Sequence, residues 1–470
     1  MKPIKSVNTG AAALLAPIAA ALVLAFAPVA HAQQAPAAAA SVAVPEAELQ
    51  KLIATYALIK QNYVGETDDK KLFDGALAGM LASLDPHSEY MNEDAMREMA
   101  RAATGQYVGI GVEIDLDHER MQVVSTVEGS PAARAGVQAG DVIVAIDDVA
   151  VGGLPAGEVA RRMLGEPGTS STFALQSHGK LKSVRIERAA LQDSTVRTRI
   201  VGQGVAWIRV AQFSGPTGGE LAAALRQLDG KAPPRGLILD LRNDPGGLVA
   251  AGVAVAGAFL PEGATVFSAH GRESGVEATV TVEQRYYRQR DEADVLAGLP
   301  AWTRSVPLVV LVNGASASAA ELVAGALQDH GRATVVGTRT FGKGSIQSII
   351  PLDEDSGIKF TVARYFTPKG REIQEHGVQP DLVVAPKAAV LAGEEPLRRE
   401  ADLAGHLAAS VPEEGGEHAA MEPARLFGTR DDQALRAAVK LLHGQEQPGG
   451  LWTALLRKLR GKPRQQVAAM

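Results

Sequence analysis

Two short segments carry residue types that can perform acyl transfer. The first is Asn313-Gly314-Ala315-Ser316-Ala317-Ser318-Ala319-Ala320-Glu321, which follows an apolar run at 307–312 and opens a helical pattern over 319–330. Ser318 is therefore expected at a turn from a buried strand to a helix, where small neighbours let a substrate backbone approach. A helix start offers N–H groups and a positive dipole end to a developing oxyanion, which suits a serine nucleophile.

The second segment, Phe341-Gly342-Lys343-Gly344-Ser345-Ile346-Gln347, offers a base. None of the ten histidines lies in a recognisable triad setting, and no Gly-x-Ser-x-Gly elbow occurs. A lysine can deprotonate a serine only when burial lowers its pKa from roughly 10.4 towards neutrality, and Lys343 directly follows an apolar region. If 344–352 is a strand, Gln347 lies on the same face as Lys343 and can orient the amine.

These segments resemble the carboxyl-terminal processing (tail-specific) peptidases, which use a serine/lysine dyad and carry a PDZ domain. In that family the nucleophile is the second serine of a Ser-Ala-Ser-Ala block, the lysine lies 25 residues further on and a glutamine 4 beyond it, as do Ser318, Lys343 and Gln347 here. The resemblance implies Ser318 as nucleophile, Lys343 as general base and Gln347 as its orienting partner. It also covers Leu84-Asp85-Pro86-His87-Ser88, Leu239-Asp240-Leu241-Arg242-Asn243-Asp244-Pro245-Gly246-Gly247, Gln328-Asp329-His330-Gly331-Arg332-Ala333 and Tyr365-Phe366-Thr367-Pro368-Lys369-Gly370.

The glycine turn after the predicted strand at 236–241 has N–H groups that can bind an anion. The family resemblance implies that the amides of Gly246 and Ala319 form a two-donor oxyanion hole, whereas the residues alone also allow a plain turn. Two positions depart from the family pattern: Asp244 replaces a common Asn, and Ala320 replaces a common Ser. Neither change removes a reacting group. Asp329, on the same predicted helix as Ser318, either helps to align the turn or forms a salt bridge at the helix end.

From Gly105 the apolar period changes from helical to alternating, which predicts a β domain over 105–190. The pattern resembles a circularly permuted PDZ module, in which a peptide adds as an extra strand and a glycine-containing loop holds its terminal carboxylate. By that resemblance the substrate's C-terminus binds at Tyr107, Val108, Gly109 and Ile110. The alternative is that the glycines only permit a bulge at the start of a strand.

The predicted fold class is α/β plus β. An N-terminal helical unit at 46–104 precedes the inserted PDZ-like domain, and 191–387 alternate strands with helices as a peptidase core that is α/β and, by the resemblance, crotonase-like. Within the core, segment 265–300 is charged and irregular, and it is expected to be a flap or insertion beside the site. Residues 388–470 are expected to be a linker and a C-terminal helical tail that ends in a basic run.

The N-terminus has the form of a secretory signal. Lys2 and Lys5 precede an apolar stretch at 11–29, and Ala30-His31-Ala32 provides a small-residue cleavage site. We therefore expect residues 1–32 to be removed after Ala32, 33–45 to be a flexible lead, and the protein to be exported to the periplasm. Uncleaved, the same stretch is long enough to act as a membrane anchor.

Composition narrows the function further. The absence of cysteine excludes thiol catalysis and thiolate metal sites, and the net charge of −6 gives no sign of a nucleic-acid partner. We expect no metal or other cofactor. The expected partners are C-termini of unfolded or partly folded proteins, with an adaptor protein and a homo-oligomer left open.

The sequence therefore predicts an exported serine endopeptidase that recognises protein C-termini. A non-enzymatic peptide-binding adaptor on the same scaffold is the alternative, although such a homologue is expected to lose Ser318 or Lys343. A Ser-His-Asp esterase is disfavoured because the chain has neither an elbow nor a placed histidine.

Overall fold

The computed structural model describes residues 45–445 except 118–119, 128, 155, 178, 193, 203, 231–232, 273–276, 289–291, 387–396, 412–421 and 423–426. The predicted signal at 1–32, nearly all of the lead at 33–45 and the basic end of the tail lie outside the described residues, so these remain predictions. Within the described part of the chain, no helix is both long and apolar enough to cross a membrane.

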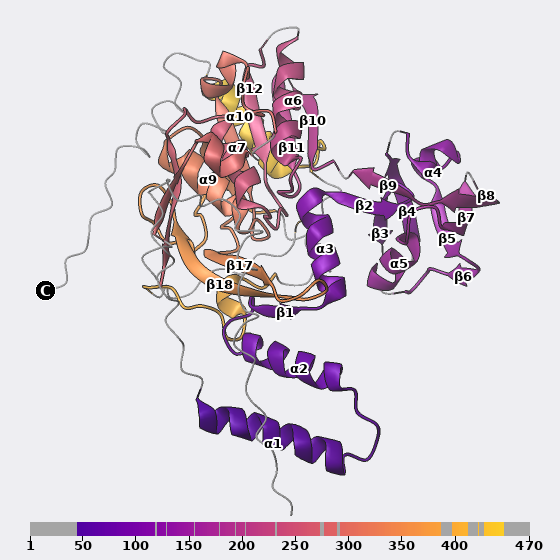
Figure 1. The fold of residues 1–470 in the computed structure, drawn as a ribbon. Coiled ribbons are helices and arrows are strands. Elements are labelled where there is room, and N and C mark those ends of the chain that lie inside the picture. The colour runs from indigo at the N-terminus through magenta and orange to yellow at the C-terminus, as the bar shows by residue number, and fades with distance from the viewer. Residues whose placement is uncertain are drawn as a thin grey trace, which may run out of the picture.

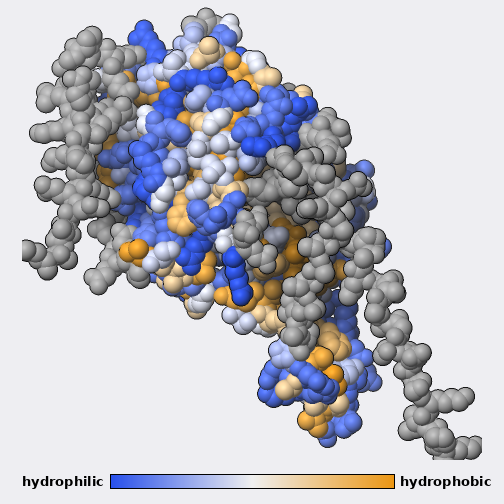
Figure 2. Space-filling view, turned by 60° about the vertical axis from the view of Figure 1, so that its left-hand side comes forward, coloured by the Kyte–Doolittle hydropathy of each residue, from blue (hydrophilic) through white to orange (hydrophobic). Residues whose placement is uncertain are grey.

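Two N-terminal helices form a lobe at the base of the molecule (Figure 1). They are α1 (Glu46–Asn62) and α2 (Asp69–Ala82), which meet through the rings of Tyr56 and Phe73, 5.2 Å apart. Asp68 caps α2 by accepting the amide of Lys71. The lobe keeps hydrophobic side chains on its surface, which Figure 2 shows as orange patches; they include Leu49, Leu52, Ile53, Leu58, Phe73 and Met80.

The predicted helical unit also contains a strand. After Pro86 the chain extends into β1 (Glu89–Met91), which pairs with a strand of the peptidase core and buries Met91. The chain then enters α3 (Glu93–Thr104), which Asn92 caps and which ends at Gly105 in the left-handed conformation, with φ 68°. Thus α3 leads from the core directly into the next domain (Figure 1).

The inserted domain is a β module with its own core, as the alternating pattern predicted. A two-stranded ribbon of β2 (Gln106–Gly109) and β9 (Ala189–Gln192) joins it to the body. Its main sheet has the order β3-β4-β5-β7-β8, so β3 (Val112–Asp117) lies at an edge. The other elements are β4 (Arg120–Thr126), α4 (Pro131–Arg134), β5 (Val142–Ile146), β6 (Val149–Ala150), α5 (Ala156–Met163), β7 (Ser170–Ser177) and β8 (Lys180–Glu187).

The predicted peptidase core is built on a six-stranded sheet with the order β10-β11-β12-β15-β16-β19. All neighbouring pairs are parallel except β10 with β11. The strands are β10 (Val196–Val201), β11 (Val205–Val210), β12 (Gly236–Asp240), β15 (Leu308–Val312), β16 (Thr334–Gly337) and β19 (Leu382–Val383). The central strands β12 and β15 are buried along their whole length because helices cover both faces.

Three helices cover one face of this sheet and one helix covers the other. α6 (Thr217–Asp229), α7 (Val249–Gly257) and α9 (Ala319–Asp329) pack with alternate strand residues such as Ile208 and Leu239. On the opposite face α10 (Gln433–Gln445) packs against Trp207, Ile238 and Val309. Successive side chains of a strand point to opposite faces of the sheet. Ile208 and Leu239 therefore pack with α6, α7 and α9, while Trp207, Ile238 and Val309 pack with α10.

This part of the molecule also contains a second sheet. It has the order β1-β18-β13-β14, with β17 also paired to β18. Its remaining strands are β13 (Thr265–Gly271), β14 (Ala278–Thr281), β17 (Ser345–Pro351) and β18 (Gly357–Phe366), and the short helices nearby are α8 (Gln284–Tyr287), η2 (Ala301–Arg304) and η3 (Glu400–Asp402).

The expectation that segment 265–300 is irregular is wrong for 265–271 and 278–281, which are strands. This stretch supplies β13 and β14, whose apolar residues Val266, Phe267 and Val280 are buried in the main core cluster. The strands are short, and the charged residues between and after them hid their apolar pattern. The predicted boundaries at 105–190 and 191–387 remain predictions.

Candidate active site

Ser318 lies at the turn between β15 and α9, where the sequence placed it. Its backbone has φ 52° and ψ −115°, a conformation that is uncommon for a residue with a side chain. The preceding turn is fixed by Ser316, whose hydroxyl donates to Leu241 O (2.7 Å) and accepts from Asn313 N (2.9 Å). The strained residue is therefore held by a turn that is itself bonded to the neighbouring strand end.

Glu321 joins the nucleophile turn to the lysine loop. Its carboxylate is fully buried and accepts the backbone amides of Ser318 (2.9 Å), Gly342 (2.6 Å) and Lys343 (2.9 Å). The hydroxyl of Thr340 donates to the same carboxylate at 2.5 Å. Burial raises the pKa of Glu321 to about 7, although these four donors favour the charged form.

Tyr365 makes a second bridge between the same two segments. Its phenol donates to the backbone carbonyls of both Ser318 and Lys343, and its side chain is buried. Glu321 therefore ties the amides of the two residues together while Tyr365 ties their carbonyls. The relative position of Ser318 and Lys343 is set by backbone bonds on both sides.

Lys343 lies in a loop whose backbone forms hydrogen bonds with other segments of the chain. Phe341 N donates to Ser316 O (3.0 Å), Glu375 N donates to Gly342 O (2.8 Å), and Gly344 N donates to the side-chain oxygen of Gln374 (2.9 Å). Burial lowers the pKa of the Lys343 amine below its usual range. This is the direction of shift that a neutral amine base requires.

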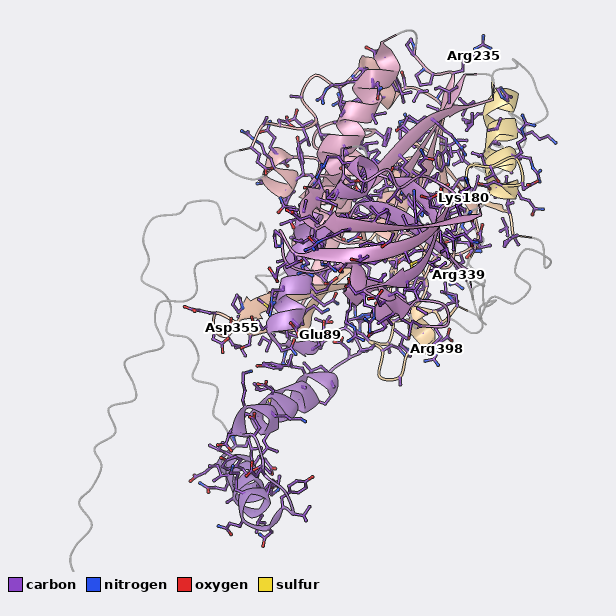
Figure 3. The ribbon with its side chains drawn as sticks, turned by 90° about the vertical axis from the view of Figure 1, so that its right-hand side faces the viewer. Glu89, Lys180, Arg235, Arg339, Asp355 and Arg398 are labelled. Carbon is purple, nitrogen blue, oxygen red and sulfur yellow. The ribbon has the colours of Figure 1, made fainter. Side chains whose placement is uncertain are left out.

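Charged neighbours modify that shift in both directions. Lys359 lowers the pKa of Lys343 further, whereas the carboxylates of Glu400, Glu321 and Asp85 oppose the change. Lys359 is held by an ion pair with Glu89, which Figure 3 places between the helical lobe and the body.

The side-chain amide of Gln347 donates hydrogen bonds to two hydroxyl groups. Its Nε2 donates to Ser345 Oγ (2.9 Å) and to Thr361 Oγ1 (3.2 Å). Because both N–H groups of the amide are used, its carbonyl oxygen is the atom left to accept a hydrogen bond from the Lys343 amine. The proposed orienting contact between Gln347 and Lys343 stays a prediction.

Gly246 lies directly against the nucleophile. A Cβ added at this residue would come within 2.8 Å of both the Ser318 Cβ and the Ala319 N, and the residue has φ 91°. Its own N–H donates to Asp244 Oδ1 at 2.8 Å, while Asp244 Oδ2 is buried without a partner. Burial raises the pKa of Asp244 well above its usual value. The assignment of Gly246 and Ala319 to an oxyanion hole stays a prediction, and it requires the Gly246 amide to leave Asp244.

One cavity of about 430 Å³ brings the predicted catalytic residues together. Ser318, Lys343, Gln347, Gly246 and Ala319 all line it, together with apolar side chains from several elements, such as Phe213, Val253, Phe267, Ile346 and Met99. Such a size and lining are typical of a ligand site. In the described part of the chain, no group of three or more His, Cys, Asp or Glu side chains could hold a metal ion.

The predicted peptide-binding residues lie elsewhere. Tyr107, Val108 and Gly109 are in β2, and Ile110 follows it with its side chain in the core of the inserted domain. None of the four lines the cavity. The next strand is the edge strand β3, which is where a peptide can add to this sheet.

Asp329 forms its hydrogen bonds and salt bridge at the C-terminal end of α9, away from the Ser318 turn. It accepts from Lys369 N (2.9 Å) and from the guanidinium of Arg371 (2.6 Å). Eleven residues of helix separate it from Ser318, which is about 16 Å. The arrangement matches the salt-bridge alternative.

Sequence reasoning gave no role to Glu321 or Tyr365. For Glu321 a signal was available, because a serine followed three residues later by a glutamate is the spacing of a capping box at a helix start. For Tyr365 no local pattern exists, since its bonds join segments 47 and 22 residues away in sequence.

Comparisons with known proteins identify families that match parts of this chain. Residues 204–384 match Peptidase family S41, 18–95 match the activating protease CtpB N-terminal domain, and 122–177 match a PDZ domain. A carboxy-terminal-processing protease of Bartonella bacilliformis is 38% identical over 393 residues, which cover 82% of this chain and 86% of that protein.

Two further proteins are similar. A carboxyl-terminal-processing protease of Synechocystis sp. is 38% identical over 66% of this chain and 70% of that protein. The solved structure of a photosystem II D1 C-terminal processing protease is 30% identical, covers 73% of this chain and 87% of that one, and has a TM-score of 0.42.

Proposed function

We propose that this chain, which belongs to the carboxyl-terminal-processing serine peptidases of family S41, is an exported endopeptidase that captures protein C-termini and cuts through an acyl-enzyme. Ser318 is the nucleophile and Lys343 is the general base. The observation that carries this proposal is the pair of buried bridges, Glu321 and Tyr365, which hold the backbones of these two residues together beside one cavity.

The reaction requires Lys343 to be neutral when substrate is bound. Its amine takes the proton of the Ser318 hydroxyl while Oγ attacks the peptide carbonyl carbon, which forms a tetrahedral intermediate. The resulting ammonium returns the proton to the leaving amine as the C–N bond breaks, which leaves an acyl-enzyme. Water then attacks the ester while Lys343 takes its proton, and that proton passes to Ser318 Oγ as the acyl C–O bond breaks and the free acid is released.

Three other residues support these steps. Gln347 accepts a hydrogen bond from the Lys343 amine through its carbonyl oxygen and so directs the amine towards Ser318. The amides of Ala319 and Gly246 stabilise the oxyanion. Ala319 is the first residue of α9, where no intrahelical carbonyl accepts its N–H. As the negative charge develops on the oxyanion, the N–H of Gly246 breaks its hydrogen bond to Asp244 and donates to the oxyanion instead.

The inserted domain selects the substrate. Its match to PDZ domains suggests that it binds peptide C-termini. We infer that the peptide adds along β3 and that its carboxylate lies against the amides near Tyr107, Val108, Gly109 and Ile110. Export is inferred from the signal-like residues 1–32 and places the enzyme in the periplasm. Unfolded or partly folded proteins are then the substrates.

The proposal is tested by incubating the purified protein with an unfolded protein and analysing the products by mass spectrometry. Ser318→Ala should abolish cleavage, since removal of a nucleophile commonly costs several orders of magnitude in rate. A small fluorophosphonate should label the wild type at Ser318 and no other serine. The matched control is Ser348→Ala, which removes a different serine hydroxyl, on β17, the strand that also carries Gln347.

The outcomes distinguish a Ser318 peptidase from the alternatives. Normal cleavage by Ser318→Ala would reject Ser318 as nucleophile. Wild-type protein that binds an unfolded substrate but never cuts it would favour the peptide-binding adaptor instead. Loss of cleavage in Ser318→Ala with normal cleavage in Ser348→Ala supports the assignment.

A further inference from the structure

The chain beyond residue 387 returns to the core and reaches the back of the catalytic turns. α10 covers one face of the six-stranded sheet, with Leu435, Ala438 and Leu442 buried against the central strands. This segment lies outside the region that matches Peptidase family S41, residues 204–384. Its polar contacts therefore belong to a part of the chain to which no role in the reaction has been given.

Asp432 connects α10 to Arg242, two residues before Asp244. Both oxygens of Asp432 accept from the Arg242 guanidinium, at 2.9 and 2.7 Å, and both side chains are 1% exposed. The same carboxylate caps α10 by accepting Leu435 N (2.9 Å) and also accepts Gly428 N (2.8 Å). A buried bidentate pair of this kind fixes geometry because leaving either partner alone is costly.

Glu422 contacts both catalytic turns at once. Asn243 Nδ2 donates to the backbone carbonyl of Glu422 at 2.8 Å, and Asn313 Nδ2 donates to its Oε1 at 3.4 Å. The two asparagines also bind each other, through Asn243 N to Asn313 Oδ1 (2.9 Å) and Asn313 Nδ2 to Asn243 Oδ1 (2.7 Å). Arg242 lies 3.5 Å from the other oxygen of Glu422.

These contacts lie where small shifts matter. Asn243 has φ 52° and immediately precedes the turn that carries Gly246, and Asn313 directly follows β15 and begins the turn that carries Ser318. The two turns are also joined by Ala317 N donating to Asp244 O (2.9 Å). None of Asn243, Asn313 and Glu422 lines the cavity, so they hold the turns without touching substrate there.

We propose that Glu422 and Asp432 form a C-terminal clamp that positions the Gly246 turn relative to Ser318, so that the two predicted oxyanion donors keep their spacing. This inference rests on the proposed function. The clamp residues are positioning residues, because they act only through Asn243, Asn313 and Arg242. Their loss should lower kcat and leave KM nearly unchanged, since capture of the substrate tail takes place in the inserted domain.

The experiment uses the full chain and compares Glu422→Ala with Glu422→Gln. The alanine variant removes the carboxylate that Asn313 and Arg242 contact, whereas glutamine keeps an oxygen for Asn313 and should restore activity. Asn243→Asp keeps a residue that tolerates positive φ but replaces the N–H donors that face Glu422 with a carboxylate. We expect a roughly tenfold loss in kcat for Glu422→Ala and Asn243→Asp, smaller than the loss of roughly a hundredfold or more for an oxyanion donor removed outright.

The matched control is Arg436→Ala on the exposed side of α10, where the guanidinium donates to the Arg430 carbonyl (2.9 Å). The readouts are kcat and KM for peptide cleavage, the rate at which a small fluorophosphonate labels Ser318, and the Tm. The labelling rate depends on the dyad and the oxyanion donors but not on the inserted domain.

Two results would overturn the clamp. One is a folded Glu422→Ala and a folded Asn243→Asp that both keep the wild-type kcat and labelling rate. The other is an equal loss in Arg436→Ala, which would indicate a general effect of α10. An active Ser318→Ala would instead reject the proposed function, and the clamp with it, so the two failures can be told apart.

Discussion

The peptidase core and the inserted PDZ domain hold their functional residues in different ways. In the core, Glu321 and Tyr365 tie Ser318 to Lys343 through buried bonds. In the inserted domain, β3, the proposed binding strand, lies at the edge of its sheet among the described strands, and the hydrophobic cluster shares no residue with that of the core. The difference suggests a division of labour in which the core sets the rate of chemistry and the PDZ domain sets which chain is captured.

The end of α3 lies at the junction between the core and the inserted domain and forms a hydrogen bond with each of them. Gly215 N donates to Ala103 O (2.8 Å), and Gln192 Nε2 donates to Thr104 O (3.0 Å). Changes in the core should therefore lower kcat, whereas changes in tail recognition should raise KM.

The largest effect is expected from Lys343→Arg. A guanidinium stays protonated and cannot accept the Ser318 proton, so kcat should fall by several orders of magnitude although the positive charge is kept. In the wild type, burial lowers the pKa of Lys343, so kcat/KM should rise with pH as the amine loses its proton at a pH below the usual range for lysine. The measurement is kcat/KM against pH for both proteins.

Lys182→Arg provides the control in the other region, because Lys182 pairs with Asp141 on the surface of the PDZ domain (3.1 Å). It should leave the pH profile unchanged. Near wild-type activity in Lys343→Arg would show that another group removes the proton.

Glu321→Gln should give the next largest loss. The amide presents an NH₂ group to backbone N–H donors, so the Ser318 and Lys343 segments must move apart. A displacement of about 1 Å can cost roughly a hundredfold in rate, and we expect a loss of that order in kcat with little change in KM. Thr340→Val removes only one of the four donors to Glu321 and should cost less. A Glu321→Gln enzyme with normal kcat would contradict the bridging role.

The same substitution should change how stability depends on pH. Burial raises the pKa of Glu321 from 4.5 to about 7 in the folded protein, so the folded state binds this proton more tightly than the unfolded state. The stability that the group contributes is complete below 4.5 and is lost as pH rises through about 7. The free energy of unfolding of the wild type, relative to that of Glu321→Gln, should therefore fall over this range. Denaturant titrations at several pH values measure the difference.

Blocking the substrate tail should have a smaller effect, and on KM. A substrate with a free, apolar C-terminus should be cut faster than the same substrate with an amidated tail, because the PDZ domain is proposed to bind the carboxylate. Hydrogen bonds to a charged group contribute about 1.5–3 kcal/mol, so KM should rise roughly tenfold or more on amidation while kcat stays similar. Equal kinetics for both substrates would remove tail recognition from the proposal, and a change confined to kcat would break the division between the two regions.

The parts that the sequence predicted correctly are those that local patterns determine. The strand-to-helix turn at Ser318 and the strands of the core follow from apolar runs and small residues that are close in sequence. The missed features join distant segments. Tyr365 reaches back to Ser318 and Lys343, and Glu422 reaches Asn243 and Asn313 across more than a hundred residues. No periodicity encodes such contacts, because they depend on how the chain packs.

Asp244 illustrates a second limit. The sequence showed that an acid replaces the family's common Asn, and this change left all reacting groups in place. Only the structure indicates that its carboxylate accepts the Gly246 amide while its other oxygen is buried without a partner. A sequence pattern identifies which residues are present at a turn, but the direction of an N–H depends on the bonds around it.

The smallest effect is expected from Lys359→Gln, and it concerns the electrostatics of the core alone. Lys359 lies opposite Ile349 on paired strands, lines the same cavity as Lys343, and is held by Glu89. Its charge lowers the pKa of Lys343 in addition to the effect of burial, so its removal should move the rise of kcat/KM to higher pH. Lys359→Arg keeps the charge and should keep the profile. At high pH, where Lys343 is neutral in every variant, the three enzymes should have similar kcat and KM. A shift in KM without a shift in the pH profile would assign Lys359 to substrate binding instead.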